Sequence, residues 1–176
     1  MKIQDLIFPT SHLKVLKFLC EYMGKDFYDT EVSRLINGVS KAAANKALRD
    51  LSALGITKRF FIGNLALNRV EPTTTFIREF KKNIYITELA DFIEESKAWT
   101  QEMYIFGDFI DKPFEDKPIA DLLIVTSKEE RIRRLFTQYH YTKMLNPLYY
   151  TPEQFEWFKT ESPTIWEEVQ KSLKLI

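Results

Sequence analysis

The chain has 176 residues, of which 45% are hydrophobic and 28% charged, a composition typical of folded proteins and not of disordered ones. No apolar run approaches the roughly eighteen residues that a membrane-spanning helix needs, and the N-terminus lacks the pattern of a signal peptide. We therefore expect a cytoplasmic protein. The single cysteine, Cys20, excludes an internal disulfide, and its apolar neighbours predict a buried, unreactive thiol.

The net charge is zero, but the charges are distributed unevenly along the chain. Residues 1–82 hold 14 Lys and Arg against 8 Asp and Glu, a balance of +6. Residues 83–176 hold 11 against 17, a balance of −6. A basic half joined to an acidic half prompts a search for a nucleic-acid-binding module in the basic half.

Three short helices are predicted in the first half. Apolar residues recur at helical spacing in residues 11–23, 30–36 and 41–54, with Ser11 as a suitable N-cap for the first helix. Ser40 is a suitable N-cap for the third helix, which follows the second after a turn that contains glycine. Two short helices joined in this way form the helix-turn-helix pattern.

The third predicted helix has two different faces. Its apolar side gathers Ala44, Ala47, Leu48 and Leu51. The opposite side carries Lys41, Asn45 and Arg49 one turn apart, with Ala42 and Lys46 beside them. Such a face suits the major groove of DNA, because small residues permit close approach, Asn and Arg read base edges, and Lys contacts phosphate. The same pattern also fits an ordinary amphipathic helix with a solvated polar face.

Two β-rich runs follow this helix, separated by Gly63 and Asn64, a two-residue hairpin turn with glycine first. Residues 1–72 therefore resemble the winged helix-turn-helix domains of prokaryotic transcription regulators, with the hairpin as the wing. This resemblance implies double-stranded DNA as the ligand, although winged helices also serve as protein-interaction modules. The candidate phosphate contacts in the hairpin are Lys58, Arg59, Asn64, Asn68 and Arg69.

Residues 73–99 form a predicted helical connector. Its apolar residues fit an amphipathic helix, and the β-branched cluster at 84–87 favours a bend or an interruption. A long amphipathic helix after a wing either pairs with a copy of itself, which predicts a homodimer, or packs only on its own chain. Trp99, at the end of the connector, is expected to anchor a core.

Strands alternate with helices in residues 100–176, which predicts a small α/β domain and makes the whole chain α+β. The predicted strands are residues 103–106, 120–125 and 144–151. Pro147 is expected to break the third strand early. Ser127 and Glu130 form a capping box for the helix that follows the second strand.

A more specific resemblance lies in residues 106–125. Phe106-Gly107-Asp108 ends a strand, a polar loop follows, and Asp121 lies within the next apolar strand. This order is similar to the Phe-Gly-Ser and Asp-x-Asp-Leu-Leu-Val-Val motifs of the minimal nucleotidyltransferases, relatives of β-type DNA polymerases. Residues 146–155 also look like that family's third strand and its following helix.

The resemblance implies a phosphoryl-transfer site for two metal ions, of which this chain keeps only a part. The family's three metal-binding carboxylates correspond to Ile119, Asp121 and a position near Asn146. The family's phosphate-binding serine corresponds to Asp108, whose charge would repel a triphosphate. Asp121, Gly107 and Asp108 are therefore interpreted as the remnant of a site, and we expect a domain without catalysis, cofactor or metal.

These observations favour a DNA-binding transcription regulator whose nucleotidyltransferase-like domain supplies dimerisation, partner binding or nucleotide sensing. A second interpretation is an active, Mg²⁺-dependent nucleotidyltransferase with a rearranged metal site. In it, a loop carboxylate from Asp108, Asp111, Glu115 or Asp116 lies beside Asp121. A third interpretation makes both halves protein-interaction modules without a DNA ligand.

Overall fold

The computed structural model describes residues 10–71, 74–110, 120–139 and 144–176, and within these ranges it is mixed α+β, as predicted. The described residues divide into two compact units. The first takes in those up to Thr87 together with Ile110, and the second takes in Glu88–Phe109 and those from Ala120 onward. In the described ranges, no helix combines the length and the apolar character needed to cross a membrane.

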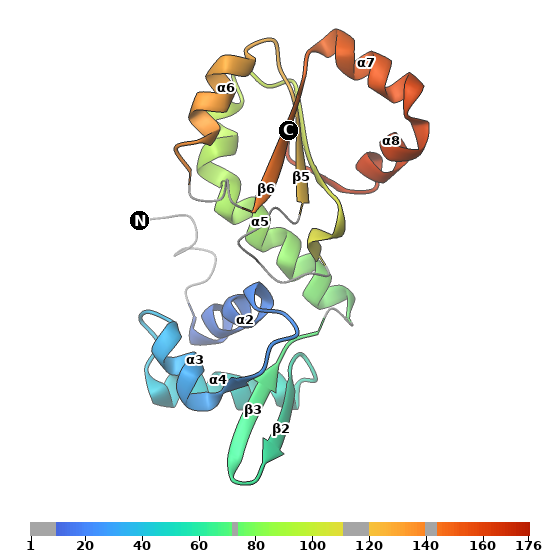
Figure 1. Ribbon diagram of the computed structural model, residues 1–176. Coiled ribbons are helices and arrows are strands. Elements are labelled where there is room, and N and C mark those ends of the chain that lie inside the picture. The colour runs from blue at the N-terminus through green and yellow to red at the C-terminus, as the bar shows by residue number, and fades with distance from the viewer. Residues whose placement is uncertain (1–9, 72–73, 111–119, 140–143) are drawn as a thin grey trace. The chain divides into compact units, whose positions relative to one another are not determined.

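The first unit begins with three helices, α2 (Ser11–Glu21), α3 (Asp29–Leu35) and α4 (Lys41–Ala53) (Figure 1). The predicted cap of α4 is confirmed, because the Ser40 hydroxyl accepts a hydrogen bond from the backbone N–H of Ala43 at 3.2 Å. The predicted cap of α2 is wrong by one residue, since Thr10 accepts from Leu13 N–H instead. Gly38, with a φ of 73°, makes the turn between α3 and α4.

The three helices enclose an apolar core. The four residues predicted for the inner side of the third helix, Ala44, Ala47, Leu48 and Leu51, are all buried. They belong to one cluster with Leu16, Leu19 and Cys20 of α2. Burial raises the pKa of the Cys20 thiol to about 12, so the thiol stays protonated and unreactive at neutral pH, as the sequence predicts.

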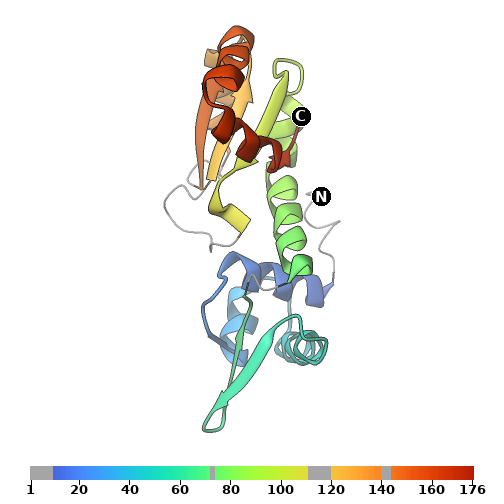
Figure 2. The ribbon, with the colours of Figure 1, turned by 90° about the vertical axis from the view of Figure 1, so that its right-hand side faces the viewer.

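A small antiparallel sheet completes the first unit. It consists of β1 (Phe27–Tyr28), β2 (Lys58–Ile62) and β3 (Leu65–Arg69), in the order β1-β3-β2. The β2–β3 hairpin turns at Gly63, whose φ of 59° fits a two-residue turn with glycine first. The hairpin projects beyond α3 and α4 on the side away from α2 (Figures 1 and 2). Strand β1 was not predicted, because two residues carry no periodic signal.

Helix α5 (Thr75–Ser96) covers most of the predicted connector, and the division between the two units lies within it. Of the bend or interruption expected at residues 84–87, the interruption does not occur. Ile84 and Tyr85 are buried, and the Thr87 hydroxyl donates to the carbonyl of Ile84 at 3.1 Å. Burial of the apolar face thus outweighs the low helix propensity of the β-branched residues.

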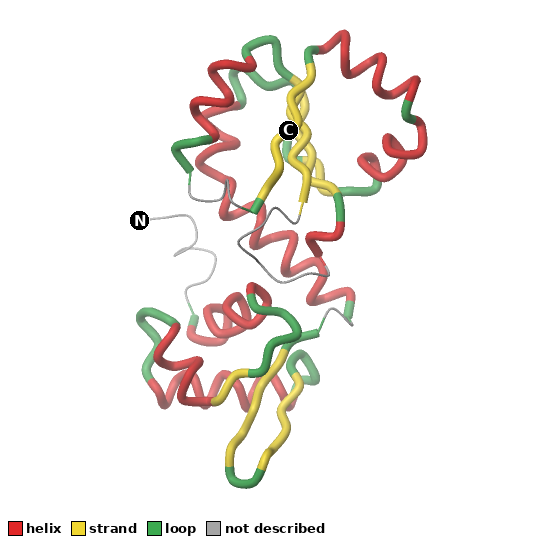
Figure 3. Tube along the Cα trace, in the orientation of Figure 1, coloured by secondary structure: helices red, strands yellow, loops and turns green. Residues whose placement is uncertain are grey.

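The second unit contains a four-stranded sheet, drawn in yellow in Figure 3. Its strands are β4 (Glu102–Phe106), β5 (Ala120–Val125), β6 (Leu145–Tyr150) and β7 (Leu173–Lys174), in the order β6-β5-β4-β7. Strands β5 and β6 are parallel, and the other pairs are antiparallel. Pro147 does not break β6 as expected, because β6 is an edge strand, where a missing N–H on the outer side costs no ladder bond.

Helices cover both faces of this sheet. Figure 1 shows α7 (Pro152–Glu161) and α8 (Pro163–Gln170) on one side, and α6 (Glu129–Phe136) with the later part of α5 on the other. The predicted capping box of α6 is wrong: the helix begins at Glu129 with Lys128 as a cap that makes no side-chain bond. The Thr126 hydroxyl accepts from Lys128 N–H at 2.9 Å in its place.

Alternate strand residues serve the two faces of the sheet. Tyr104 and Phe106 of β4 cluster with Leu123 and Val125 of β5 and with apolar residues of α7 and α8. On the other face, the rings of Phe92 in α5 and Phe136 in α6 lie edge to face at 5.4 Å. The second unit therefore has an apolar layer on each side of its sheet.

Glu102 fastens the C-terminal strand β7 to β4. Its carboxylate accepts hydrogen bonds from the Tyr104 hydroxyl and from the Lys174 ammonium, the latter at 3.1 Å. Burial raises the pKa of Glu102, but the hydrogen bonds from Tyr104 and Lys174 outweigh it and hold the pKa below its ordinary value of 4.5. The ionised form of Glu102 is thus favoured in the folded protein.

Replacing Glu102 with Gln is expected to reduce the loss of stability in acid. Because the pKa is lower in the folded protein than in the unfolded chain, ionised Glu102 stabilises the fold above about pH 4.5 and loses this effect as the pH falls through the lowered pKa. The free energy of unfolding in urea, compared between neutral pH and about pH 3, should therefore fall less in Glu102→Gln than in the original protein. As a control, Glu168→Gln replaces an exposed residue of α8, and its free energy of unfolding should fall as much as that of the original protein.

Candidate functional site

The outer face of α4 carries positive charge that the protein itself does not neutralise. Lys41, Lys46 and Arg49 are exposed, and none of them forms an ion pair with another described residue. Asp50, the one acidic residue of α4, is engaged by His12 of α2, with 2.8 Å between His12 Nε2 and Asp50 Oδ2. Asn45, predicted to read bases, is half-buried on this helix. Three cations of α4 thus remain available to an anionic partner.

The predicted cations of the hairpin, in contrast, have partners within the first unit. Lys58 pairs with Glu71. Arg69 Nε lies 3.3 Å from Asp26 Oδ1 and 3.5 Å from Glu71 Oε1. The hydrogen bond from Lys58 lowers the pKa of Glu71, which keeps that carboxylate ionised. The base of the hairpin is therefore close to charge-neutral.

Arg59 belongs to a part-buried network that joins three elements. Its Nη2 lies 2.7 Å from Oδ2 of Asp29, the first residue of α3, and its Nη1 donates to Oδ1 of Asn68 at 3.2 Å. Asn68 is fully buried, and its Nδ2 donates to Asp29 Oδ1 at 2.8 Å and to the carbonyl of Phe27 at 3.3 Å. Arg59 and Asn68, both predicted as phosphate contacts, thus hold the hairpin to β1 and α3.

The tip of the hairpin has a different character from its base. Phe61 is 66% exposed, Ile62 is 62% exposed and Leu65 is 55% exposed. Ile62 and Leu65 are partners across the hairpin, next to the turn at Gly63 and Asn64. Residues 60–67 contain no charged side chain. Of the predicted hairpin contacts, only Asn64 lies at this exposed tip.

The two groups of cations should differ in their effect on stability. Arg59→Gln leaves the carboxylate of Asp29 part-buried without its cation, so the free energy of unfolding should fall by about 2–3 kcal/mol. Arg49→Gln removes an exposed side chain without a described partner and should change it by less than about 0.5 kcal/mol. Urea unfolding of both variants measures the difference. A small effect of Arg59→Gln would contradict the structural role of this network.

In the second unit, Asp121 is hydrogen-bonded to the side-chain amide of Asn146. The parallel register of β5 and β6 sets Asp121 opposite Asn146, and Asn146 Nδ2 donates to Asp121 Oδ1 at 2.8 Å. The resemblance places a third metal-binding carboxylate near Asn146. An amide N–H there satisfies one oxygen of Asp121 and adds no negative charge that would attract a metal ion.

Gly107 and Asp108 lie close to Asp121 in the fold. Asp121 is paired with Phe106 across β4 and β5, and Gly107 follows Phe106 with a φ of 99°, a conformation that favours glycine. Asp108 is exposed and begins the short 3-10 helix η1 (Asp108–Ile110). The loop carboxylates Asp111, Glu115 and Asp116, and Ile119, lie outside the described residues. Within the described ranges, no three His, Cys, Asp or Glu side chains gather as a metal site requires.

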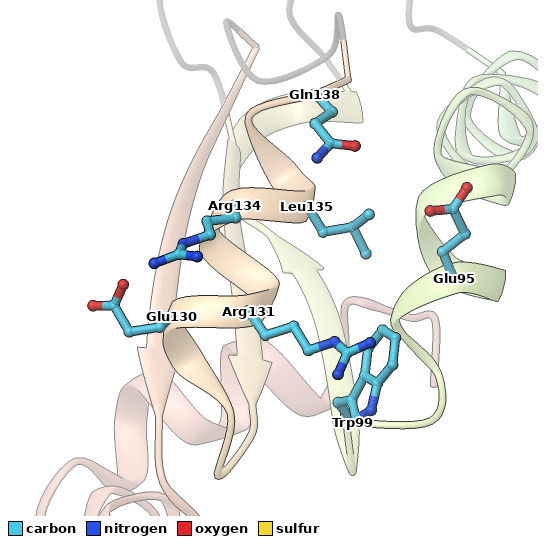
Figure 4. Close-up of a pocket in the computed structure, with 7 residues that line it drawn as sticks. All are labelled: Glu95, Trp99, Glu130, Arg131, Arg134, Leu135 and Gln138. Atoms are coloured by element: carbon cyan, nitrogen blue, oxygen red, sulfur yellow. The ribbon is translucent and has the colours of Figure 1, made fainter.

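A pocket of about 580 Å³ lies between α6 and the end of α5 (Figure 4). The Arg131 guanidinium stacks on the Trp99 ring at 3.6 Å from its centre. The residues that line the pocket are Glu95, Trp99, Glu130, Arg131, Arg134, Leu135 and Gln138. Its two carboxylates balance its two guanidiniums, so the pocket favours neither cations nor anions. The pocket is also on the other side of the sheet from Asp121, which shares its face with Leu123 and Val125.

Sequence reasoning missed both the pocket and the apolar hairpin tip. Trp99 was expected to anchor a core, and nothing in the spacing of Trp99 and Arg131 indicates that they stack. For the tip, a signal was present: the run Phe60-Phe61-Ile62 in a hairpin cannot be buried on both sides by a two-stranded ribbon.

Comparisons with protein-family models, with curated proteins and with solved structures found no match to this chain. Its functional interpretation therefore rests on its own residues and their geometry.

Proposed function

We propose that this protein is a DNA-binding transcription regulator whose first unit is a winged helix-turn-helix domain. The observation that carries the proposal is the outer face of α4, where Lys41, Lys46 and Arg49 remain without described ion-pair partners. The order of three helices followed by a hairpin supports the same interpretation. A polyanion is the partner that such a face attracts, because each cation bound to phosphate releases counterions from the duplex.

In this proposal α4 enters the major groove. Arg49 has the side chain that recognises guanine edges, while Lys41 and Lys46 contact phosphates on either side. Asn45 reads an adenine edge only if its side chain rotates, because its amide oxygen is buried in this structure. The hairpin contributes less to phosphate binding than its sequence indicates. Lys58, Arg59 and Arg69 would have to leave carboxylate partners in their own unit before they reached DNA.

Reversing the charges of Lys46 and Arg49 to Glu should weaken binding to duplex DNA by about 100-fold at moderate salt. It should also make the slope of log affinity against log salt shallower by about 1, because Lys46 loses a phosphate contact, whereas Arg49 loses a contact to a base edge. Fluorescence anisotropy of a labelled duplex across a salt series measures both quantities.

The matched control for this experiment is the double variant Lys97→Glu with Lys171→Glu. It changes net charge equally but alters exposed lysines of the second unit. Binding that ignores salt, or that weakens equally in both double variants, would contradict a DNA interface on α4. That outcome would favour the interpretation of both units as protein-interaction modules.

The second unit is, in this proposal, a nucleotidyltransferase-like domain that no longer transfers nucleotides. The hydrogen bond from Asn146 to Asp121 supports this view, because an amide, and not a second carboxylate, is paired with Asp121. Such a domain retains a scaffold for dimerisation, for binding a partner protein or for binding a nucleotide. Its sheet has an apolar layer on each side, and the burial of these layers stabilises the fold.

Incubation with labelled nucleoside triphosphates and Mg²⁺ should label neither the protein nor added DNA above background. Asp121→Asn should be indistinguishable from the original protein in this assay, because a single carboxylate cannot hold two metal ions. Mg²⁺-dependent labelling that Asp121→Asn abolishes would contradict the proposal and would establish the alternative, an active enzyme with a rearranged metal site.

A further inference from the structure

The tip of the β2–β3 hairpin lacks the cations with which a wing binds phosphate. Its exposed side chains are Phe61, Ile62 and Leu65, and the cations of the same hairpin are held at its base by Asp26, Asp29 and Glu71. A tip without cations gains nothing from phosphate. It also carries no negative charge that phosphate would repel, so contact with the apolar and aromatic parts of DNA remains open to it.

The apolar side chains are arranged as a narrow projection. Ile62 and Leu65 form the last cross-strand pair before the turn, so their side chains lie on the same face, and Phe61 lies on the opposite face. The hairpin extends beyond α3 and α4, so its tip is the part of this unit that reaches farthest from the core (Figure 2). Its shape is that of a thin apolar edge and not of a flat patch.

The small size of this surface argues against a second copy of the chain as its partner. A stable dimer buries about 800 Å² on each partner. Three side chains, none of them fully exposed, provide well below that area even if the whole tip is covered. A base step of DNA is a smaller target, and one or two apolar side chains are enough to wedge it open.

We propose that the hairpin tip inserts Ile62 and Leu65, supported by Phe61, as an apolar wedge into the minor groove of the duplex that α4 binds. This inference rests on the DNA-binding function proposed above. The wedge partly unstacks one base step and bends the duplex away from the hairpin, toward the major groove where α4 lies.

The wedge also predicts a class of preferred target. Pyrimidine–purine steps such as TA and CA unstack at low cost, whereas A-tracts are stiff. A duplex with a flexible step where the tip meets the minor groove should bind more tightly than one with an A-tract there. This specificity arises from deformation of the duplex and needs no hydrogen bond from the tip to a base.

The test uses the whole 176-residue chain and a duplex that this chain enriches from a random-sequence pool, with 2-aminopurine placed at successive steps. Ile62→Thr combined with Leu65→Thr places β-branched side chains suited to a strand at both positions but makes the tip polar. Relative to the original protein, this variant should bind about tenfold more weakly with an unchanged salt slope, because no phosphate contact is lost. It should also lose the rise in 2-aminopurine fluorescence that marks an unstacked step.

Two comparisons separate the possible failures. Ile165→Thr, at an exposed apolar position of α8, should bind and unstack as the original protein does. If the tip variant equals the original in affinity and fluorescence while Lys46→Glu with Arg49→Glu loses binding, the wedge is wrong and the DNA interface on α4 stands. If the original protein enriches no duplex, the DNA-binding proposal and the wedge both fail.

Sedimentation velocity provides the remaining check. If the tip variant dissociates a dimer of the original protein and leaves DNA affinity per protomer unchanged, the tip is a contact between copies of the chain and the wedge is overturned. Unfolding in urea confirms that the tip variant retains its fold, since its three-helix core is untouched. A Phe61→Thr variant removes the supporting side chain and tests the same wedge by the same measurements of affinity and 2-aminopurine fluorescence.

Discussion

The network of Asn68, Asp29 and Arg59 determines how the first unit is assembled and which of its charges are free. Asn68 is fully buried and bonds to the carbonyl of Phe27 and to Asp29, while Arg59 pairs with the same carboxylate. A buried amide without these partners would destabilise the fold, so the hairpin is held against β1 and the start of α3. The same bonds withdraw Arg59 from the surface, whereas Lys41, Lys46 and Arg49 of α4 remain exposed.

The difference between the exposed cations of α4 and the paired cations of the hairpin follows from the distribution of carboxylates. Asp26, Asp29 and Glu71 lie around the base of the hairpin and engage its cations, whereas the only carboxylate of α4, Asp50, is engaged by His12. Positive charge therefore survives on one helix face and is cancelled at the hairpin. The exposed tip is thus the apolar part of the hairpin, without charged side chains of its own.

In the second unit, the residues that build the sheet differ from those that surround Asp121. The apolar strands β4 and β5, and Gly107 with its positive φ, build the sheet whether or not a metal is bound. Asp121 has a hydrogen-bond partner in Asn146. With Asn146 as its neighbour, the carboxylate of Asp121 accepts a hydrogen bond. Asp in place of Asn146 would set two carboxylates side by side, which repel each other unless a cation lies between them. The identity of residue 146 is therefore as informative as that of Asp121.

The sequence by itself determined the elements whose signals are local: the inner side of α4, the cap at Ser40, the turn at Gly63 and the strand at residues 120–125. It failed where distant residues decide. Burial kept α5 continuous through residues 84–87, an edge position allowed Pro147 within β6, and the strands β1 and β7 exist only because longer strands lie beside them. The tertiary structure likewise decided which cations have an ion-pair partner. Lys46 and Arg59 are equivalent by sequence, but only the folded chain brings Asp29 and Asn68 to Arg59, because ion pairs depend on distances in space.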